Sequence, residues 1–391
     1  MRDCIPIGGW RAAVTCALAA VLLAAQVRGL SQPAPVPGRA RPKPVRGAPS
    51  ASEPARLQAK ALARLDRYDL LLYHDDGGEV QRAKTVAEWQ RRRAEIMRGL
   101  VAVAGPLPGP EKRCPLAVTV EEEVDCGSYV RRFLTYAAEP GDRVPAYLLI
   151  PKSALTNGAS CPAVLCLHQT HALGQKVVVG LGNSTNDEYG VELALRGYVC
   201  LAPAYPLLAN YHPNLQALGY KSGVMKAIWN NVRGLDLLAS LPFVKPARFG
   251  AIGHSLGGHT AVFTAVFDER ITVVVSSCGL DSFVDYMDGD ITGWTSDRYL
   301  PRLRDYALRE IPFDFPELIG ALAPRVGFLS APFGDTNFKW RSVHAIEQAA
   351  LPVYRLYGAP DHLRVEHPNC AHQFPPQMRA LACQLFDQYL R

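Results

Sequence analysis

The chain has 391 residues, of which 48% are hydrophobic and 20% charged, and these proportions suit a globular protein with a sizeable core. Proline (31) and glycine (32) follow no period, which excludes collagen-like and repeat architectures. The net charge of +6 comes from residues 1–50, which hold seven arginines or lysines and one aspartate. The other 341 residues carry 35 charges of each sign. This balance gives no electrostatic case for a nucleic-acid partner.

The N-terminus has the features of an export signal. Arg2 and Arg11 precede an apolar run, residues 12–25, which is shorter than the ~20 residues that a membrane-spanning helix needs. We therefore expect residues 1–30 to be a signal peptide, and the protein to be secreted or periplasmic with no membrane span after signal removal. The alternative is an uncleaved anchor. Residues 31–55 are rich in Pro, Ala and Arg, which predicts a disordered linker.

Residues 56–117 follow as an expected N-terminal helical lead-in that packs on the main domain. The motif GPLPGP, residues 105–110, stops the helical pattern. The helical periodicity is carried by Leu57, Leu62, Leu65, Trp89, Ile96, Met97 and Leu100.

From about Thr119 the pattern changes to strands joined by turns. Residues 129–152 predict a hairpin with its turn at 139–143. Continuous apolar runs then alternate with helix-like stretches, which predicts an α/β fold with a mostly parallel sheet buried on both faces. In such sheets the chemistry lies at the carboxyl ends of the strands. The apolar runs are residues 163–167, 198–202, 249–253, 272–276, 326–330 and 363–366.

Ser255 is the candidate nucleophile. The strand candidate 249–253 runs directly into GHSLGGH, which contains G-x-S-x-G, and a helix-like stretch, residues 259–267, follows. This motif makes a sharp strand-to-helix turn in which glycines leave room and the seryl oxygen points out over the sheet edge. The helix then directs its first N–H groups at the place where negative charge develops. The alternative is a glycine-rich turn with a structural serine.

His372 is the predicted base. It lies between the last strand candidate and the final helix-like stretch, residues 377–390, which places it above the sheet on the side of the nucleophile. It would take the proton of Ser255 during attack. His367, at the strand end, is the competitor, and a surface or helix-capping role is the alternative for His372.

Asp335 is the acid predicted to orient the base. It follows the strand candidate 326–330, and in sites of this kind the order along the chain is serine, acid, histidine. Asp361 is the rival. Because Asp361 precedes the last strand, it would lie at the opposite edge of the sheet.

The oxyanion hole should use two backbone N–H groups. One belongs to Leu256, the residue after the nucleophile. The second should come from the loop after strand candidate 163–167, with Gln169 favoured over Thr170. His168 and His171 are interpreted as positioning this loop. A two-histidine metal site is disfavoured, because no carboxylate stands at matching spacing.

A cap-like insertion is expected at residues 278–325. In it, Trp294 and Tyr299 could stack on a sugar ring, or they could pack the cap onto the body. With His168 and His254 they form the set of candidate pocket residues.

The ten cysteines show no zinc-site spacing, and two of them, Cys4 and Cys16, leave with the signal. Cys114 and Cys126 are a candidate local disulfide. Four others lie in or next to apolar runs and are interpreted as small buried hydrophobes: Cys161, Cys166, Cys200 and Cys278.

The chain resembles bacterial α/β-hydrolases of the acetyl-xylan-esterase-like and dienelactone-hydrolase-like group. The resemblance spans about residues 89–391 and is carried by VPAYLLIPK, LCLHQTHALG, GHSLGGH, FLSAPFGDTNF and CAHQFPP. It implies an α/β-hydrolase catalytic domain over residues 118–391 that hydrolyses carboxylic esters, often of acylated sugars or polysaccharides. One departure matters: glucuronoyl esterases of related architecture carry Arg directly after the nucleophile, where this chain has Leu256. That difference weakens a uronate-ester assignment.

The expected function is therefore a cofactor-free serine esterase that acts on small-molecule or polysaccharide esters, since no nucleotide, flavin or metal motif is present in the sequence. A prolyl-oligopeptidase-like peptidase is one alternative. The segment before the catalytic domain, however, is too short for even two propeller blades of ~40–45 residues. A non-catalytic binding protein on the same fold is the other alternative.

Overall fold

The computed structural model describes residues 63–156, 160–182 and 184–391. The expected signal peptide and linker lie outside these residues. The chain divides into two units, Met1–Gln58 and Ala59–Arg391, and the description below concerns the second. Within the described residues, no helix is both long and apolar enough to cross a membrane.

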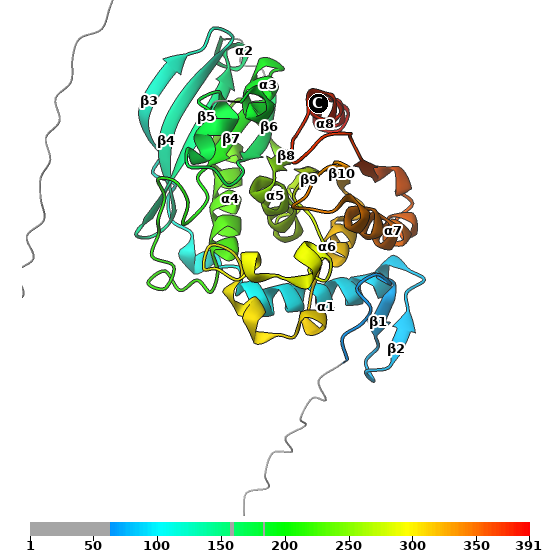
Figure 1. The fold of residues 1–391 in the computed structure, drawn as a ribbon. Helices are drawn as coiled ribbons and strands as arrows, with labels where there is room; N and C mark the ends of the chain where they lie inside the picture. Colours follow the sequence, from blue (N-terminus) through cyan, green and yellow to red (C-terminus); the bar gives the residue numbers. More distant parts are fainter. Residues whose placement is uncertain (1–62, 157–159, 183) are drawn as a thin grey trace, which may run out of the picture. The chain divides into compact units, whose positions relative to one another are not determined.

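Nine strands form one sheet (Figure 1). Their bounds are β3 (Thr119–Asp125), β4 (Tyr129–Glu139), β5 (Asp142–Pro151), β6 (Cys161–Leu167), β7 (Val199–Pro203), β8 (Val244–His254), β9 (Ile271–Ser277), β10 (Val326–Ser330) and β11 (Leu363–Glu366). Their order is β11-β10-β9-β8-β6-β7-β5-β4-β3. The six strands from β6 to β11 pair in parallel, whereas β3, β4 and β5 are antiparallel. The mostly parallel sheet and the hairpin of β4 and β5 are confirmed.

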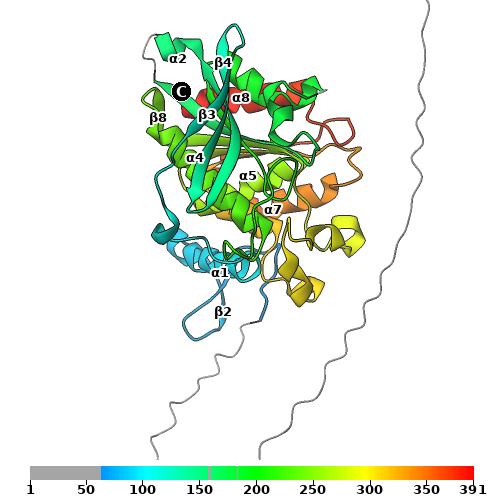
Figure 2. The same cartoon turned by 90° about the vertical axis from the view of Figure 1, so that its left-hand side faces the viewer.

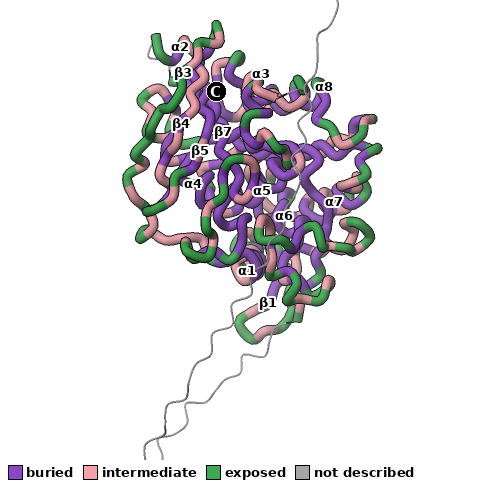
Figure 3. The backbone as a smooth tube through the Cα atoms, turned by 60° about the vertical axis from the view of Figure 1, so that its left-hand side comes forward, coloured by how far each residue is buried: buried purple, intermediate pink, exposed green. Residues whose placement is uncertain are grey.

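Helices cover both faces of the sheet. Neighbouring residues on a strand point to opposite faces, so they pack in different hydrophobic clusters. The helices that follow the strands are α2 (Lys152–Thr156), α3 (Tyr189–Leu195), α4 (Gly223–Ser240), α5 (Leu256–Phe267), α6 (Phe315–Leu322), α7 (Trp340–Leu356) and α8 (Pro376–Leu390). Val164 and Ile252 join the cluster that contains α3 and α8. Their neighbours Leu165 and Ala251 join the cluster that contains α4 and α5. In Figure 2, α8 lies on the other side of the sheet from α4 and α5. Figure 3 shows the inner strands and α5 largely buried, and the edge strand β3 exposed.

The segment before the sheet is helical only in part. Helix α1 (Val86–Ala104) begins at Thr85, whose hydroxyl accepts from the Glu88 N–H while Glu88 reaches back to the Thr85 N–H. The prediction of a helix is wrong for β1 (Leu72–His74) and β2 (Val80–Arg82), which form a hairpin. There Asp75 accepts N–H groups of the turn, a local bonding pattern that competes with a helix.

Residues between β9 and β10 form the expected insertion. Four short 3-10 turns between Tyr286 and Glu310 precede α6. The insertion lies against α1, because the Arg302 guanidinium donates to the Ala102 carbonyl and a Cβ on Gly99 would lie 2.2 Å from the Pro312 carbonyl oxygen. Helix α1 therefore packs against the insertion, and the two lie side by side in Figure 1.

Candidate active site

Ser255 occupies the sharp turn between β8 and α5. Its backbone has φ 53° and ψ −119°, a region that side-chain-bearing residues rarely adopt. Its N–H donates to the Ser277 carbonyl on β9 at 2.8 Å. A Cβ on Gly253 would lie 2.2 Å from the Gly257 backbone, and one on Gly257 would lie 1.8 Å from the Leu167 carbonyl oxygen. Only glycine fits at these two positions, so the glycines of the motif make the turn possible.

Asp335 and His372 are joined at the same edge of the sheet. His372 Nδ1 lies 2.8 Å from Asp335 Oδ2, and the Asp335 side chain is fully buried. The other carboxylate oxygen accepts the N–H groups of Asn337 (2.8 Å) and Phe338 (3.1 Å). Burial raises the pKa of Asp335, but the hydrogen bonds from His372 and these N–H groups outweigh it, and the pKa lies below its ordinary value. The carboxylate is therefore held ionised against the imidazole.

The rival acid and base lie elsewhere. Asp361 is exposed and lies in the turn that precedes β11, at the opposite edge of the sheet. His367 Nδ1 bonds the Ala331 carbonyl at 2.8 Å, and its ring lies between Phe333 and Trp340. Neither residue contacts Asp335 or His372 in the hydrogen bonds of the described residues.

Among the described residues, no hydrogen bond joins Ser255 to the Asp335–His372 pair, and the contact between the two segments runs through His254. The ring of His254, the residue before Ser255, has its centroid 4.8 Å from that of His372. Among the described residues, the Ser255 hydroxyl makes no hydrogen bond within 3.5 Å, whether to His372 or to another group. In the absence of substrate, hydrogen bonds of this kind are often long and shorten in the complex.

The predicted oxyanion donors belong to two segments that meet beside Ser255. The close approach of Gly257 to the Leu167 carbonyl places the loop after β6 against the first turn of α5. Within the described residues, no protein acceptor takes the backbone N–H groups of Leu256, Gln169 or Thr170. Free N–H groups from two elements at a helix N-terminus suit the stabilisation of an anion.

His168 holds the loop after β6. Its Nδ1 lies 2.8 Å from the Gln169 carbonyl oxygen, and its Nε2 accepts the Tyr205 N–H at 3.1 Å. Burial lowers its pKa to about 4, so the ring is neutral at neutral pH. The ring thereby sets the plane of the Gln169–Thr170 peptide, and with it the direction of the Thr170 N–H. Both nitrogens serve the backbone, so the ring offers substrate little, and His168 holds the loop, as the sequence also allowed.

Of the other candidate pocket residues, Trp294 and His254 are buried, and only Tyr299 is partly exposed. Trp294 is only 3% exposed and packs on His259 at 4.7 Å, so its ring cannot serve as a platform for a sugar and instead anchors the insertion. Tyr299 is partly exposed, and its hydroxyl lies 3.4 Å from that of Thr170, beside the expected oxyanion loop. His254 is buried beneath His372 with Nδ1 3.2 Å from the Ser277 hydroxyl, and burial lowers its pKa to about 3.

Cys278 is a neighbour of the site that the sequence reading missed. It directly follows β9, has φ 48°, and its sulfur lies within 4.8 Å of ligand atoms of Asp335 and His372. The available signal was its place at the carboxyl end of a strand, because that edge of the sheet carries the other site residues. The candidate disulfide of Cys114 with Cys126 is absent, and both are thiols.

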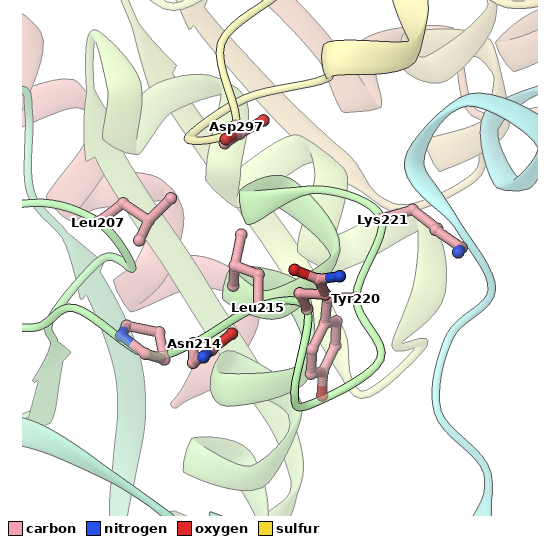
Figure 4. Close-up of a pocket in the computed structure, with 8 residues that line it drawn as sticks. Leu207, Asn214, Leu215, Tyr220, Lys221 and Asp297 are labelled. Carbon is pink, nitrogen blue, oxygen red and sulfur yellow. The ribbon is translucent and has the colours of Figure 1, made fainter. Parts of the chain in front are cut away.

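A cavity of about 350 Å³ lies between the loop after β7 and the insertion (Figure 4). None of its lining residues belongs to the predicted triad, and its link to the site is Leu208, the neighbour of Leu207, which packs in one cluster with Leu256. Its size falls in the range of ligand pockets. The lining residues are Leu207, Pro213, Asn214, Leu215, Gln216, Tyr220, Lys221 and Asp297.

No protein-family model matches the chain. It is 26% identical over 310 residues to YtaP of Bacillus subtilis (strain 168), which is named as a hydrolase, and the match spans 76% of this chain and all of YtaP. A glucuronoyl esterase from Solibacter usitatus is similar in structure, with TM-score 0.63 and 18% identity over 84% of this chain and 97% of that one. A Bacteroides fragilis NCTC 9343 protein named as an acetyl xylan esterase has TM-score 0.54 and 18% identity over 72% and 75%. These likenesses and the strand order show the α/β-hydrolase fold.

Proposed function

We propose that this α/β-hydrolase is a serine esterase in which Ser255 is the nucleophile, His372 the general base and Asp335 the acid that orients the base. One observation carries the proposal. The buried Asp335 carboxylate bonds His372 Nδ1 at 2.8 Å, at the sheet edge where Ser255 sits in a strained turn. When Nδ1 donates to Asp335, the neutral imidazole presents the lone pair of Nε2, which can accept a proton.

The reaction follows from these positions. Ser255 Oγ attacks the ester carbonyl carbon while His372 Nε2 takes its proton, and Asp335 stabilises the imidazolium. The proton then passes to the alcohol oxygen as the C–O bond breaks, which leaves an acyl group on Ser255. Water, deprotonated by His372, attacks that acyl group and releases the acid. The same imidazole returns the proton to Ser255, so the cycle closes.

The negative oxygen formed at each attack is held by the N–H groups of Leu256 and of Gln169 or Thr170. The helix dipole of α5 adds to this stabilisation. Losing one such donor costs ~10²–10³ in rate. Because these donors are backbone groups, the bonds of the His168 ring to the Gln169 carbonyl and the Tyr205 N–H support the site indirectly.

A carbohydrate ester is the substrate class that we propose. The cavity beside the insertion presents Asn214, Gln216, Lys221 and Asp297, groups that can hydrogen-bond sugar hydroxyls. The likenesses to a glucuronoyl esterase and to a protein named as an acetyl xylan esterase agree with this class. Leu256, in place of Arg after the nucleophile, favours an uncharged acyl group such as acetyl over a uronate. The leader pattern of residues 1–30 supports export, so an extracellular polysaccharide is accessible to the enzyme.

A panel of esters tests this proposal directly. Acetylated xylan, a glucuronate ester and p-nitrophenyl acetate are offered to the wild type and to Ser255→Ala, with Ser296→Ala as the exposed-serine control. We expect acetyl release by the wild type and the control, and loss of at least about 10⁴-fold in Ser255→Ala. Undiminished turnover by pure Ser255→Ala, or faster cleavage of a dipeptidyl substrate than of any ester, would overturn it.

A further inference from the structure

We propose that Cys278, Asp335 and His372 form a binding site for a soft divalent cation, Zn²⁺ or Cd²⁺, whose occupancy switches off the proposed esterase. The inference rests on the proposed function for its consequence, but the binding itself does not depend on catalysis. It goes beyond the triad because Cys278 has no part in the ester chemistry described above.

The geometry of the cluster supports a cation. One ligand atom from each of the three residues lies within 4.8 Å of the other two, and no other such cluster occurs in residues 63–156, 160–182 and 184–391. A thiolate, a carboxylate and an imidazole are ligands that zinc accepts, with bonds of ~2.0–2.3 Å. Ligand atoms of a tetrahedral zinc site lie roughly 3.3–3.5 Å apart. The sulfur therefore has to approach the other two atoms by up to about 1.5 Å, while Nδ1 and Oδ2, which are 2.8 Å apart, have to separate slightly. A water molecule would complete the fourth position.

The thiol is held in place by its backbone and its neighbours. Cys278 has φ 48°, and its N–H donates to the Ser330 carbonyl at 2.8 Å, which ties it to the strand before Asp335. Its sulfur lies 3.4 Å from the Gln373 carbonyl oxygen, one residue after His372. The cluster is open on one side, because the His372 side chain is 31% exposed while the Asp335 side chain is fully buried. A cation can therefore enter past the imidazole.

Binding changes the protonation of the site in a defined way. The Cys278 thiol releases its proton to water, and the cation takes the sulfur, an oxygen of Asp335 and Nδ1 of His372. The proton that Nδ1 held moves to Nε2, so the imidazole can no longer accept the proton of Ser255. The charges of the cation, the thiolate and the carboxylate then sum to zero, which lowers the cost of burying them.

The experiment compares the purified wild type with Cys278→Ser and with the matched control Cys370→Ser. Zinc affinity is measured by competition with a chromophoric chelator, and inhibition of p-nitrophenyl acetate hydrolysis is measured against Mg²⁺ at equal ionic strength. We expect stoichiometric zinc binding in the wild type and the control, weakened by at least about 100-fold in Cys278→Ser, with the inhibitory concentration shifted in parallel. Magnesium should have no effect, because it prefers oxygen ligands.

The outcomes separate this inference from the proposed function. Zinc affinity and inhibition that are unchanged in Cys278→Ser would overturn the site, even if the esterase activity is confirmed. Cys278-dependent binding to a protein without esterase activity would sustain the site and remove the proposed function. Should Cys278→Ser fail to fold, binding to His372→Ala is measured instead. Unaltered zinc affinity in that variant contradicts the proposal, and a similar loss sustains it.

Discussion

Two regions of the molecule bury charge in different ways. Where α1 packs on α6, Glu317 is fully buried between the guanidinium groups of Arg92 (2.5 Å) and Arg64 (2.6 Å), and Asp314 pairs with Arg67 at 2.5 Å. At the edge that carries the proposed active site, the buried Asp335 faces no arginine or lysine in the ion pairs of the described residues. It faces a histidine and two backbone N–H groups instead.

The difference separates stability from chemistry. Arginine remains protonated throughout the working range of pH, so the α1–α6 pairs are permanent and fasten the N-terminal segment to the insertion. Histidine gains and loses its proton near neutral pH, so in the proposed reaction His372 can take the proton of Ser255 and return it while Asp335 stays ionised. Substitutions in the first region should lower the free energy of unfolding with little effect on kcat. Substitutions in the second should lower kcat with little effect on the free energy of unfolding.

The largest effect is expected for Asp335→Asn. An asparagine oxygen can still accept the N–H groups of Asn337 and Phe338, so the loop should keep its shape. The neutral amide can no longer hold His372 in the reactive tautomer. We therefore expect kcat to fall by ~10⁴-fold at pH 7.5 with little change in Tm. The control is Asp361→Asn, the exposed acid at the opposite edge, which should retain full activity. Equal losses in the two variants would contradict the assignment.

Glu317→Ala should destabilise the contact between α1 and α6. It leaves Arg64 and Arg92 without their buried partner and should cost about 3–5 kcal/mol in the free energy of unfolding. Urea titration measures this cost, and kcat per folded molecule should stay near that of the wild type. Glu269→Ala is the matched control, because Glu269 is 82% exposed and lies 3.9 Å from Arg93. The control should cost less than about 1 kcal/mol; similar costs in both variants would refute the comparison.

Acid should destabilise the catalytic region. Burial lowers the pKa values of His168 to about 4 and of His254 and His259 to about 3. Their neutral folded forms contribute stability above pH 6.5, the unfolded value. That stability is lost as pH falls from 6.5 toward 4, by up to about 1.4 kcal/mol per unit for each histidine. His259→Leu, which removes one of these buried rings, should flatten the pH dependence of the free energy of unfolding seen in urea titrations at pH 7.5, 6.5 and 5.5. If the free energy of unfolding falls with pH as steeply in His259→Leu as in the wild type, the buried histidines are not the cause of the acid sensitivity.

The smallest effect concerns the cavity. Gln216→Ala and Asp297→Ala should raise KM for an acetylated xylo-oligosaccharide by about tenfold, the value of one lost hydrogen bond of ~1.4 kcal/mol. Neither should alter hydrolysis of p-nitrophenyl acetate, which has no sugar hydroxyls for these side chains to bind. Asp305→Ala, at an exposed site of the same insertion, serves as control. A uniform change for both substrates would show that the cavity does not bind sugar.

Much of the fold could be predicted because its signals are local. Most of the buried parallel strands are continuous apolar runs. The G-x-S-x-G motif determines its own turn, since a Cβ at Gly253 or Gly257 would collide with backbone atoms. The order of serine, acid and histidine then followed from the edge of a parallel sheet. The structure joins two of these residues, Asp335 and His372.

The rest depends on contacts between distant segments. From the sequence, Trp294 could either bind sugar or pack on the body. Its contact with His259 of α5 decides between the two, and no local sequence pattern predicts that contact. The hairpin at residues 72–82 arises from Asp75 and the turn rather than from apolar periodicity. The sequence predicts Cys278 to be a small buried residue at the end of a strand. Its position beside His372 depends on the contact between the end of β9 and the loop before α8.

The central claim is that His372 and Asp335 activate Ser255, and a fluorophosphonate probe tests it most directly. Intact-mass and peptide analysis of the labelled protein should show one adduct per chain, on Ser255, formed at least about 10³-fold more slowly in His372→Ala. An adduct on another serine, or labelling of Ser255 at the same rate without the imidazole, would contradict the account.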